Sequence, residues 1–308
     1  MNTFEKARAF VYRNARPLEL ARWQYHFENG SREAVLRALS FYQNDDGGFG
    51  HGIEADFLNP NSTPIGTWAA AEILNEVGFS DKNSAIVRGI ISYLESGADF
   101  DTEHNQWLNT VPTNNDYPHA VWWEYTGSPD FRYNPTAALA AFIIRFSEAG
   151  SPLYQKACGI AEQAVLWFIG SVPLEEPHIT GCFITLYNAL SETGAGFVDM
   201  PLFEGKLREN VTHCICRDKA KWASEYVTKP SSFQITPNSI FYDDNAELAD
   251  YECEFIKESQ LPDGSFTVPW QWYNGYKEFE VSANRWKSGI AISNMLYLKA
   301  FGKGDVKR

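Results

Sequence analysis

Three segments of the sequence concentrate the side chains that acid–base or binding chemistry requires. The first is His51-Gly-Ile-Glu54-Ala-Asp56-Phe, which offers an imidazole flanked by glycines and two carboxylates. Glycine allows backbone to approach a ligand closely, and the carboxylates are able to hold a substrate, bind a cation or exchange protons. The alternative is an acidic, solvated loop in which Glu54 and Asp56 cap or pair with neighbouring groups.

The second segment is Asp-Tyr-Pro-His119-Ala-Val-Trp122-Trp123-Glu124-Tyr, over residues 116–125. We expect His119 to transfer protons, because imidazole titrates near neutral pH, and Glu124 to orient it or to act itself. Consecutive side chains diverge, so we expect one of Trp122 and Trp123 to face a cavity or solvent. The alternative is a packed plug in which both tryptophans cover the core and His119 bonds to backbone.

The third segment is Pro-Trp270-Gln-Trp272-Tyr, which we place opposite Asn-Arg285-Trp286 at the start of the last predicted helix. In an extended segment Trp270 and Trp272 share one side and form an aromatic wall for a sugar ring or an isoprenoid chain. Arg285 is the expected anion contact, because free N–H groups also point outward at a helix start. Structural packing and a salt bridge are the alternatives.

Metal and cofactor motifs are weak. On a helix only His213 and Cys216 of the set His213, Cys214 and Cys216 share a face, and two ligands do not close a zinc site. The acidic segment 243–247 fits the start of a helix better than a metal site. The sequence has no phosphate-binding glycine loop, dinucleotide fingerprint, His-Glu-x-x-His or Gly-x-Ser-x-Gly motif. We therefore predict no metal and identify no cofactor.

The composition is that of a folded globular protein, and the partner that the candidate segments lead us to expect is a small-molecule substrate or ligand. A formal net charge of −13 over 308 residues opposes binding to nucleic acid or to an anionic membrane. The most apolar helical segment, residues 137–146, is far shorter than the roughly 20 residues that a bilayer span needs, and the charged first residues do not resemble a secretory signal. Five cysteines without a Cys-x-x-Cys pair suit reduced thiols. We expect a cytoplasmic protein, and the sequence leaves its oligomeric state open.

Helix signals recur along the whole chain, while strand patterns are scarce. Thr63-Pro64, Asn134-Pro135 and Ser151-Pro152 each place a capping side chain before proline at a helix start. Glycines such as Gly97 and Gly194 mark helix ends. These marks predict six helical hairpins, with helices at 3–14, 17–29, 31–43, 64–78, 82–96, 135–149, 152–170, 178–193, 201–217, 237–242, 244–260 and 283–301. Most long connections follow the first helix of a pair, so we expect them on one functional face.

Two turns repeat one pattern. Gln43-Asn-Asp-Asp46-Gly-Gly-Phe49 and Gln260-Leu-Pro-Asp263-Gly-Ser-Phe266 each place Gln at a helix end, followed by Asp-Gly-small-Phe. In physical terms Gln satisfies backbone groups, glycine permits the reversal and the aromatic ring covers the junction. The pattern resembles the repeat of squalene cyclases and of protein prenyltransferase β-subunits.

This resemblance implies a fold more than an activity. It implies an all-α (α/α)6 toroid, a double-layered ring of about six helical hairpins, formed by residues 1–308 as one domain. The family's catalytic motifs do not carry over, because the sequence lacks the Asp-x-Asp-Asp acid of terpene cyclases and the zinc ligands of prenyltransferases cannot be placed.

Three functions fit these features. The first is a terpenoid-cyclase-like or prenyltransferase-like protein with an aromatic pocket, acting on a hydrophobic or isoprenoid small molecule. The second is a carbohydrate-active hydrolase or lyase, in which Glu54 or Asp56 would be paired with Glu124. The third is a non-catalytic small-molecule-binding protein that kept the scaffold and lost the catalytic acid.

Overall fold

The chain is mostly helical. A computed structural model describes residues 1–303, and these contain eleven α-helices and one pair of two-residue antiparallel strands, β1 (Phe100–Asp101) and β2 (Gln106–Trp107). The prediction of an all-α protein is confirmed. No helix within residues 1–303 combines the length and the apolar character that crossing a membrane requires.

Contacts divide the chain into two compact units. Unit 1 comprises Met1–Leu39 and Val211–Arg308, and unit 2 comprises Ser40–Asn210. Unit 1 contains α1 (Thr3–Asn14), α2 (Pro17–Phe27), α3 (Arg32–Ser40), α10 (Tyr242–Glu258) and α11 (Phe279–Ala300). Unit 2 contains α4 (Pro64–Glu76), α5 (Ala85–Ser96), α6 (Thr136–Phe146), α7 (Pro152–Gly170), α8 (Pro177–Thr193) and most of α9 (Met200–Cys214). The single domain over residues 1–308 stays a prediction.

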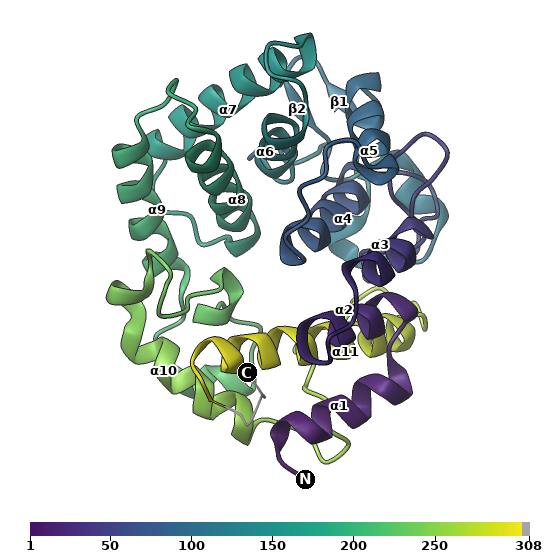
Figure 1. The fold of residues 1–308 in the computed structure, drawn as a ribbon, viewed down its shortest axis with the longest axis vertical. Coiled ribbons are helices and arrows are strands. Elements are labelled where there is room, and N and C mark those ends of the chain that lie inside the picture. Colours follow the sequence, from purple (N-terminus) through teal and green to yellow (C-terminus); the bar gives the residue numbers. More distant parts are fainter. Residues whose placement is uncertain (304–308) are drawn as a thin grey trace. The chain divides into compact units, whose positions relative to one another are not determined.

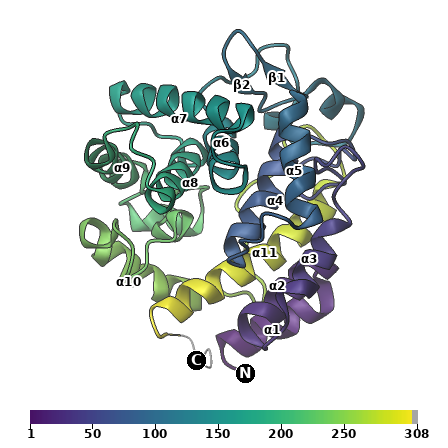
Figure 2. The ribbon, with the colours of Figure 1, turned by 45° about the horizontal axis from the view of Figure 1, so that its top comes forward.

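In unit 2 the core is built around α6. Every residue of this helix except Arg145 is buried, because its sequence is apolar all round. The helix packs against α7 and α8, and also against α4 and α5 (Figures 1 and 2). Two long connections belong to this unit, the α3–α4 loop (residues 41–63) and the α5–α6 loop (residues 97–135).

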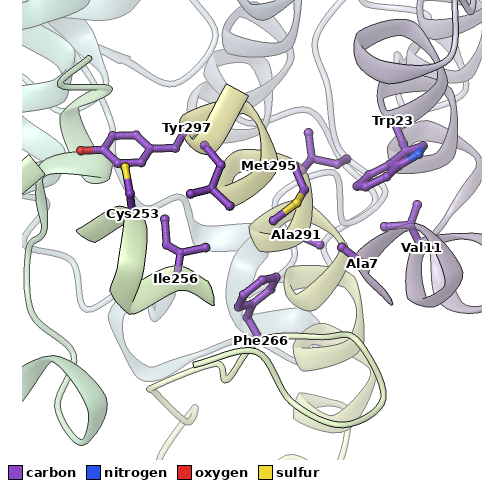
Figure 3. Packing of buried hydrophobic residues seen from close by; sticks show 11 residues of the cluster. Ala7, Val11, Trp23, Cys253, Ile256, Phe266, Ala291, Met295 and Tyr297 are labelled. Carbon is purple, nitrogen blue, oxygen red and sulfur yellow. The ribbon is translucent and has the colours of Figure 1, made fainter. Parts of the chain in front are cut away.

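In unit 1 the core is built around α11, which packs against α1, α2 and α10. Figure 3 shows Met295 of α11 with Trp23 of α2 and Ile256 of α10 around it, and all three belong to one buried apolar cluster. Its long connections are the α9–α10 loop (residues 215–241) and the α10–α11 loop (residues 259–278). Segments from the two ends of the sequence therefore share one core.

The first repeat turn docks onto the start of α5. The side-chain amide of Gln43 donates to the carbonyl of Gly47 at 2.9 Å and to that of Ile86 at 3.0 Å. Gly47 has φ +89°, and a Cβ built on it would lie 2.1 Å from the carbonyl oxygen of Gly89. Phe49 is fully buried beneath the turn. The glutamine thus ties its own turn to a neighbouring helix.

The second repeat turn docks onto α1 in the same manner. The amide of Gln260 donates to the carbonyl of Gly264 at 3.1 Å and to that of Thr3 at 2.9 Å. A Cβ on Gly264, which has φ +96°, would lie 2.1 Å from the carbonyl oxygen of Lys6. Phe266 is buried. In each turn the glycine lies against the carbonyl of a helix residue that is three positions after the residue whose carbonyl accepts from the glutamine. The two turns therefore dock on their helices in the same register.

Most predicted helix boundaries agree with the structure to within a few residues, and one predicted helix is wrong. Residues 237–242 form turns, and α10 begins at Tyr242. The amide of Ser239 donates to the Thr236 carbonyl, and its hydroxyl oxygen accepts from the amide of Phe241 at 3.2 Å. Such local bonds compete with helix formation. The strand pair β1–β2 was also not predicted.

Two of the three predicted N-caps are confirmed. Thr63 accepts a hydrogen bond from the amide of Gly66, and Ser151 accepts one from that of Tyr154. The prediction for Asn134 is wrong, because Pro135 occupies the cap position of α6 and no side chain caps that helix.

We predict that Gly47→Ala destabilises the protein by about 2–4 kcal/mol, because it combines a positive φ with a clash against backbone. Gly97→Ala is the matched control in unit 2, since Gly97 has φ +74° and a Cβ added to it would meet no atom within 4 Å. The control should lose only about 1–2 kcal/mol, the cost of the left-handed conformation alone. Urea unfolding measures both values, and equal losses would contradict the docking role of Gly47.

Candidate functional site

In unit 2 the two long loops meet backbone to backbone. Phe57 of the α3–α4 loop and His119 of the α5–α6 loop form an antiparallel bridge. The amide of Ala120 donates to the carbonyl of Asp56 at 2.8 Å. The first two sequence-predicted segments are therefore brought together, and we call them the paired loops.

The paired loops bury three titratable side chains. The exposed fractions of Glu54, Asp56 and His119 are 9%, 3% and 6%. Oε2 of Glu54 accepts the amide of Asp56 at 2.8 Å, so this carboxylate does cap neighbouring backbone. The alternative of a solvated acidic loop is wrong for both carboxylates, because neither is solvated.

A backbone contact determines which ring nitrogen of His119 carries a proton. Its Nδ1 lies 2.6 Å from the carbonyl oxygen of Tyr117, which only accepts hydrogen bonds. Nδ1 must therefore carry a proton. Within residues 1–303 the Glu124 side chain makes no hydrogen bond or ion pair, so the expectation that Glu124 orients His119 is wrong and the Tyr117 carbonyl takes that role.

Asparagine side chains hold the paired loops in place. The amide of Asn59 donates to Thr113 at 2.9 Å and to the side-chain oxygen of Asn114 at 3.0 Å. Asn114 in turn donates to the carbonyl of Trp123 at 3.0 Å. Because Asn59 and Asn114 are buried, these hydrogen bonds are shielded from water and hold the two loops together.

The two adjacent tryptophans diverge as predicted. Trp122 is 39% exposed, whereas Trp123 is half-buried and meets the ring of Phe57 edge-on at 5.5 Å. The indole N–H of Trp123 is buried and has no acceptor among the described residues. The plug alternative thus describes Trp123 and the backbone bond of His119, whereas Trp122 is partly exposed to solvent.

The remaining predicted residues of this region lie at the surface. Glu124 is exposed directly after the short 3-10 helix Val121–Trp123. His51 is exposed, has φ +56°, and its Nε2 lies 2.8 Å from the side-chain oxygen of Asn44. All five predicted residues therefore lie in one loop region. Glu54, Asp56 and His119 are buried in it, whereas His51 and Glu124 are exposed to water.

The third predicted segment lies in unit 1 and does not form a continuous wall. Trp270 packs edge-on against Tyr226 at 5.3 Å and Trp286 at 5.4 Å. Trp272 is 1% exposed and packs against two other rings, at the end of the α10–α11 loop and the start of α11. Trp270 and Trp272 therefore have different ring neighbours, and only Trp270 joins Trp286.

Arg285 faces a cavity of about 390 Å³ in unit 1. Its lining mixes both charge signs with amides, because Arg16, Glu280 and Asn284 contribute to the same walls. Arg16 is held by a two-pronged ion pair with Glu19, with its shorter distance 2.6 Å. Ala15 and Val281 also line the cavity, and most of its lining surface is apolar, so the lining does not favour a charged ligand over an isoprenoid chain.

A buried carboxylate that sequence reasoning missed lies on α10. Glu252 is 1% exposed and accepts hydrogen bonds from the amide of Ser231 at 2.7 Å and from its hydroxyl at 2.5 Å. Burial raises the pKa of Glu252 to about 7, against the opposing effects of these bonds and of the Lys229 charge. The carboxylate ties the α9–α10 loop to the helix.

A signal for this residue exists in the sequence. A carboxylate at helical spacing among apolar residues is a buried-acid candidate. The buried stripe of α10 comprises Asn245, Leu248, Ala249, Glu252, Cys253 and Ile256. Both polar members of this stripe fall outside the three segments selected above.

Within the part of the chain that the structure describes, no group of three or more His, Cys, Asp or Glu side chains is arranged to hold a metal ion. All five cysteines are free thiols. The chain matches no protein-family model, no curated protein and no solved structure.

We predict that Glu252 makes stability fall with rising pH. A carboxyl whose pKa is raised on folding contributes stability below its unfolded pKa and loses it as the pH rises through about 7. Glu252→Gln removes this effect, so the variant should gain on the order of 2 kcal/mol relative to the natural protein between pH 4 and pH 8. Guanidinium unfolding at both pH values measures the gain.

The matched control is Glu258→Gln, at the exposed end of the same helix. Its stability relative to the natural protein should change little between the two pH values. If Glu252→Gln behaves like this control, the buried carboxyl does not take up a proton on folding.

Proposed function

We propose that this chain is an enzyme that performs acid–base chemistry on a polar small molecule, with a carbohydrate as the substrate class. One observation carries the proposal: the paired loops bury two carboxylates and a histidine on bridged backbone. Titratable groups buried on loops are candidates for catalytic acids and bases. The site lies on loops held by a helical scaffold, which is where catalytic groups commonly lie.

The roles follow from the contacts. Glu54 and Asp56 supply the carboxyl groups that a hydrolase or lyase needs for proton transfer or charge stabilisation. Because Nδ1 of His119 donates to the Tyr117 carbonyl, we assign proton exchange to its Nε2. The asparagine bonds between the loops keep these groups in a fixed arrangement, which reduces the reorganisation that a reaction requires.

Sugar recognition is supported by the surface beside these groups. Trp122 presents an exposed ring on which a sugar can stack, and the exposed carboxylate of Glu124 follows two residues later. A glycosidase requires two carboxyl groups about 5–9.5 Å apart, depending on stereochemistry. We assign that pair to Glu124 and one of the buried carboxylates.

A second candidate function is supported by the aromatic cluster of unit 1. Tyr226, Trp270 and Trp286 form edge-on contacts that suit an isoprenoid or other hydrophobic molecule.

The repeat turns, which share one docking register, support the related proposal that the helical hairpins form a toroid like that of terpenoid cyclases and prenyltransferases. We place the protein in the cytoplasm, because none of its five cysteines forms a disulfide bond.

The leading proposal is tested by substrate turnover. We expect the full chain to cleave one member of a panel of nitrophenyl glycosides and oligosaccharides, and Glu54→Gln to lower kcat/KM by at least about 100-fold. Gln keeps an acceptor for the Asp56 amide, so folding should be preserved. Glu95→Gln, an exposed substitution in unit 2, is the control and should leave turnover unchanged.

The same panel separates the alternatives. Turnover of farnesyl or geranylgeranyl diphosphate without action on sugars, weakened by Trp270→Ala, would favour the isoprenoid function. Saturable binding of a sugar or prenyl compound without turnover would favour the non-catalytic function. Turnover of a sugar that survives Glu54→Gln, Asp56→Asn and His119→Asn would remove the paired loops as the catalytic site.

A further inference from the structure

We propose that Lys229 is a nucleophilic lysine that forms an imine with small aldehydes, at a site independent of the function proposed above. Lys229 belongs to unit 1 and lies in the α9–α10 loop, directly before the short 3-10 helix Pro230–Phe233. Imine formation requires an uncharged amine that a carbonyl compound can reach. Both conditions follow from the surroundings of this side chain.

The ammonium group of Lys229 has no hydrogen-bonding partner in the protein. The residue is half-buried, so part of it stays in contact with solvent. Its Nζ forms no hydrogen bond or ion pair within residues 1–303, and it lies 5.7 Å from the centre of the Phe255 ring, near the outer limit of a cation–π contact. An ammonium group carries three donors, and burial without acceptors disfavours its charged form.

The nearby carboxylate of Glu252 does not compensate for this burial. Glu252 accepts hydrogen bonds from the amide and the hydroxyl of Ser231, and it forms no ion pair with Lys229 in the described part of the chain. Burial lowers the pKa of Lys229, and the charges of Glu252 and Cys216 oppose this effect only in part. At neutral pH Lys229 therefore has a larger neutral fraction than a lysine in water.

The surroundings of Lys229 also hold it in place for a reaction. The backbone amide of Lys229 donates to the hydroxyl oxygen of Ser232 at 3.2 Å, which fixes the position from which the side chain starts. The half-buried ring of Phe255 packs against the buried ring of Trp222, with 5.6 Å between ring centres. An apolar surface therefore lies beside the amine, and the body of an aldehyde can pack on it.

Two other lysines show what distinguishes Lys229. Lys219 lies in the same loop, but its Nζ is paired with Glu247 at 3.0 Å. Lys156 of unit 2 is half-buried, and burial lowers its pKa as well. Its Nζ lies only 3.4 Å from the centre of the Phe100 ring, however, and this contact stabilises the charged form and covers one side of the nitrogen. Lys229 has neither an ion pair nor so close a ring.

The proposed reaction needs no cofactor. The lone pair of the Lys229 nitrogen attacks the carbonyl carbon of the aldehyde, and the carbonyl oxygen takes up a proton. The resulting carbinolamine loses water, and a C=N bond replaces the C=O bond. The nitrogen gives up both of its hydrogens as protons, so one amine and one aldehyde yield one imine and one water.

The experiment treats the full chain with benzaldehyde at neutral pH, traps imines with borohydride and locates the benzyl adducts by peptide mass spectrometry. We expect Lys229 to carry at least about tenfold more adduct than Lys219 or the exposed Lys221, because the imine yield rises with the neutral fraction of the amine. The preference should disappear in concentrated urea, because the fold creates it.

Substitutions then assign the adduct. Lys229→Arg keeps the positive charge but lacks the amine, so this variant should lose the fold-dependent adduct. Lys219→Arg, in the same loop, is the matched control and should keep it. Circular dichroism checks that both variants fold.

Equal labelling of Lys229, Lys219 and Lys221 in the folded chain would overturn the assignment, as would a larger adduct at Lys156 than at Lys229. Sugar turnover is measured separately, so its absence would contradict the function proposed above and not this site.

Discussion

The architecture depends on a side-chain amide that reaches two carbonyl groups at once. In each repeat turn a glutamine closes its own reversal and also binds a carbonyl in the first turn of a neighbouring helix. Glycine makes this possible, because any Cβ at Gly47 or Gly264 would collide with the backbone of that helix. The glutamine can reach the helix carbonyl only if the turn lies close to the helix, and the turn can lie that close only with glycine. The packing of each turn on its helix is therefore specified by geometry as well as by burial.

Much of the helical framework could be predicted because its signals are local. Proline at the first position and a capping Ser or Thr fix helix starts, and α4 and α7 begin where the sequence predicts. The failure at residues 237–242 has a local cause as well, since Ser239 bonds to nearby backbone and stabilises turns. The repeat turns were predicted from residue types, but their partner helices were not, because those contacts join distant parts of the sequence.

The candidate site was predicted only in part for the same reason. Residue types identified Glu54, Asp56 and His119, but their burial arises from a bridge between two loops, and a loop sequence carries no periodicity that would reveal such a bridge. Because consecutive side chains point in different directions, the sequence alone predicted that Trp122 and Trp123 differ in exposure, and they do. Glu252 and Asn245 could have been found, because both lie on a helical stripe whose other members are apolar or small.

The bond from Gln260 to the carbonyl of Thr3 has a consequence for the order of folding. Unit 2 is one continuous stretch of chain, whereas unit 1 joins segments from both ends of the sequence. During synthesis α1 and α2 leave the ribosome long before α10 and α11, which complete their core, have been made. The first helices must therefore wait with apolar faces uncovered while unit 2 is able to fold, and in this interval the nascent chain is exposed to aggregation and to chaperones.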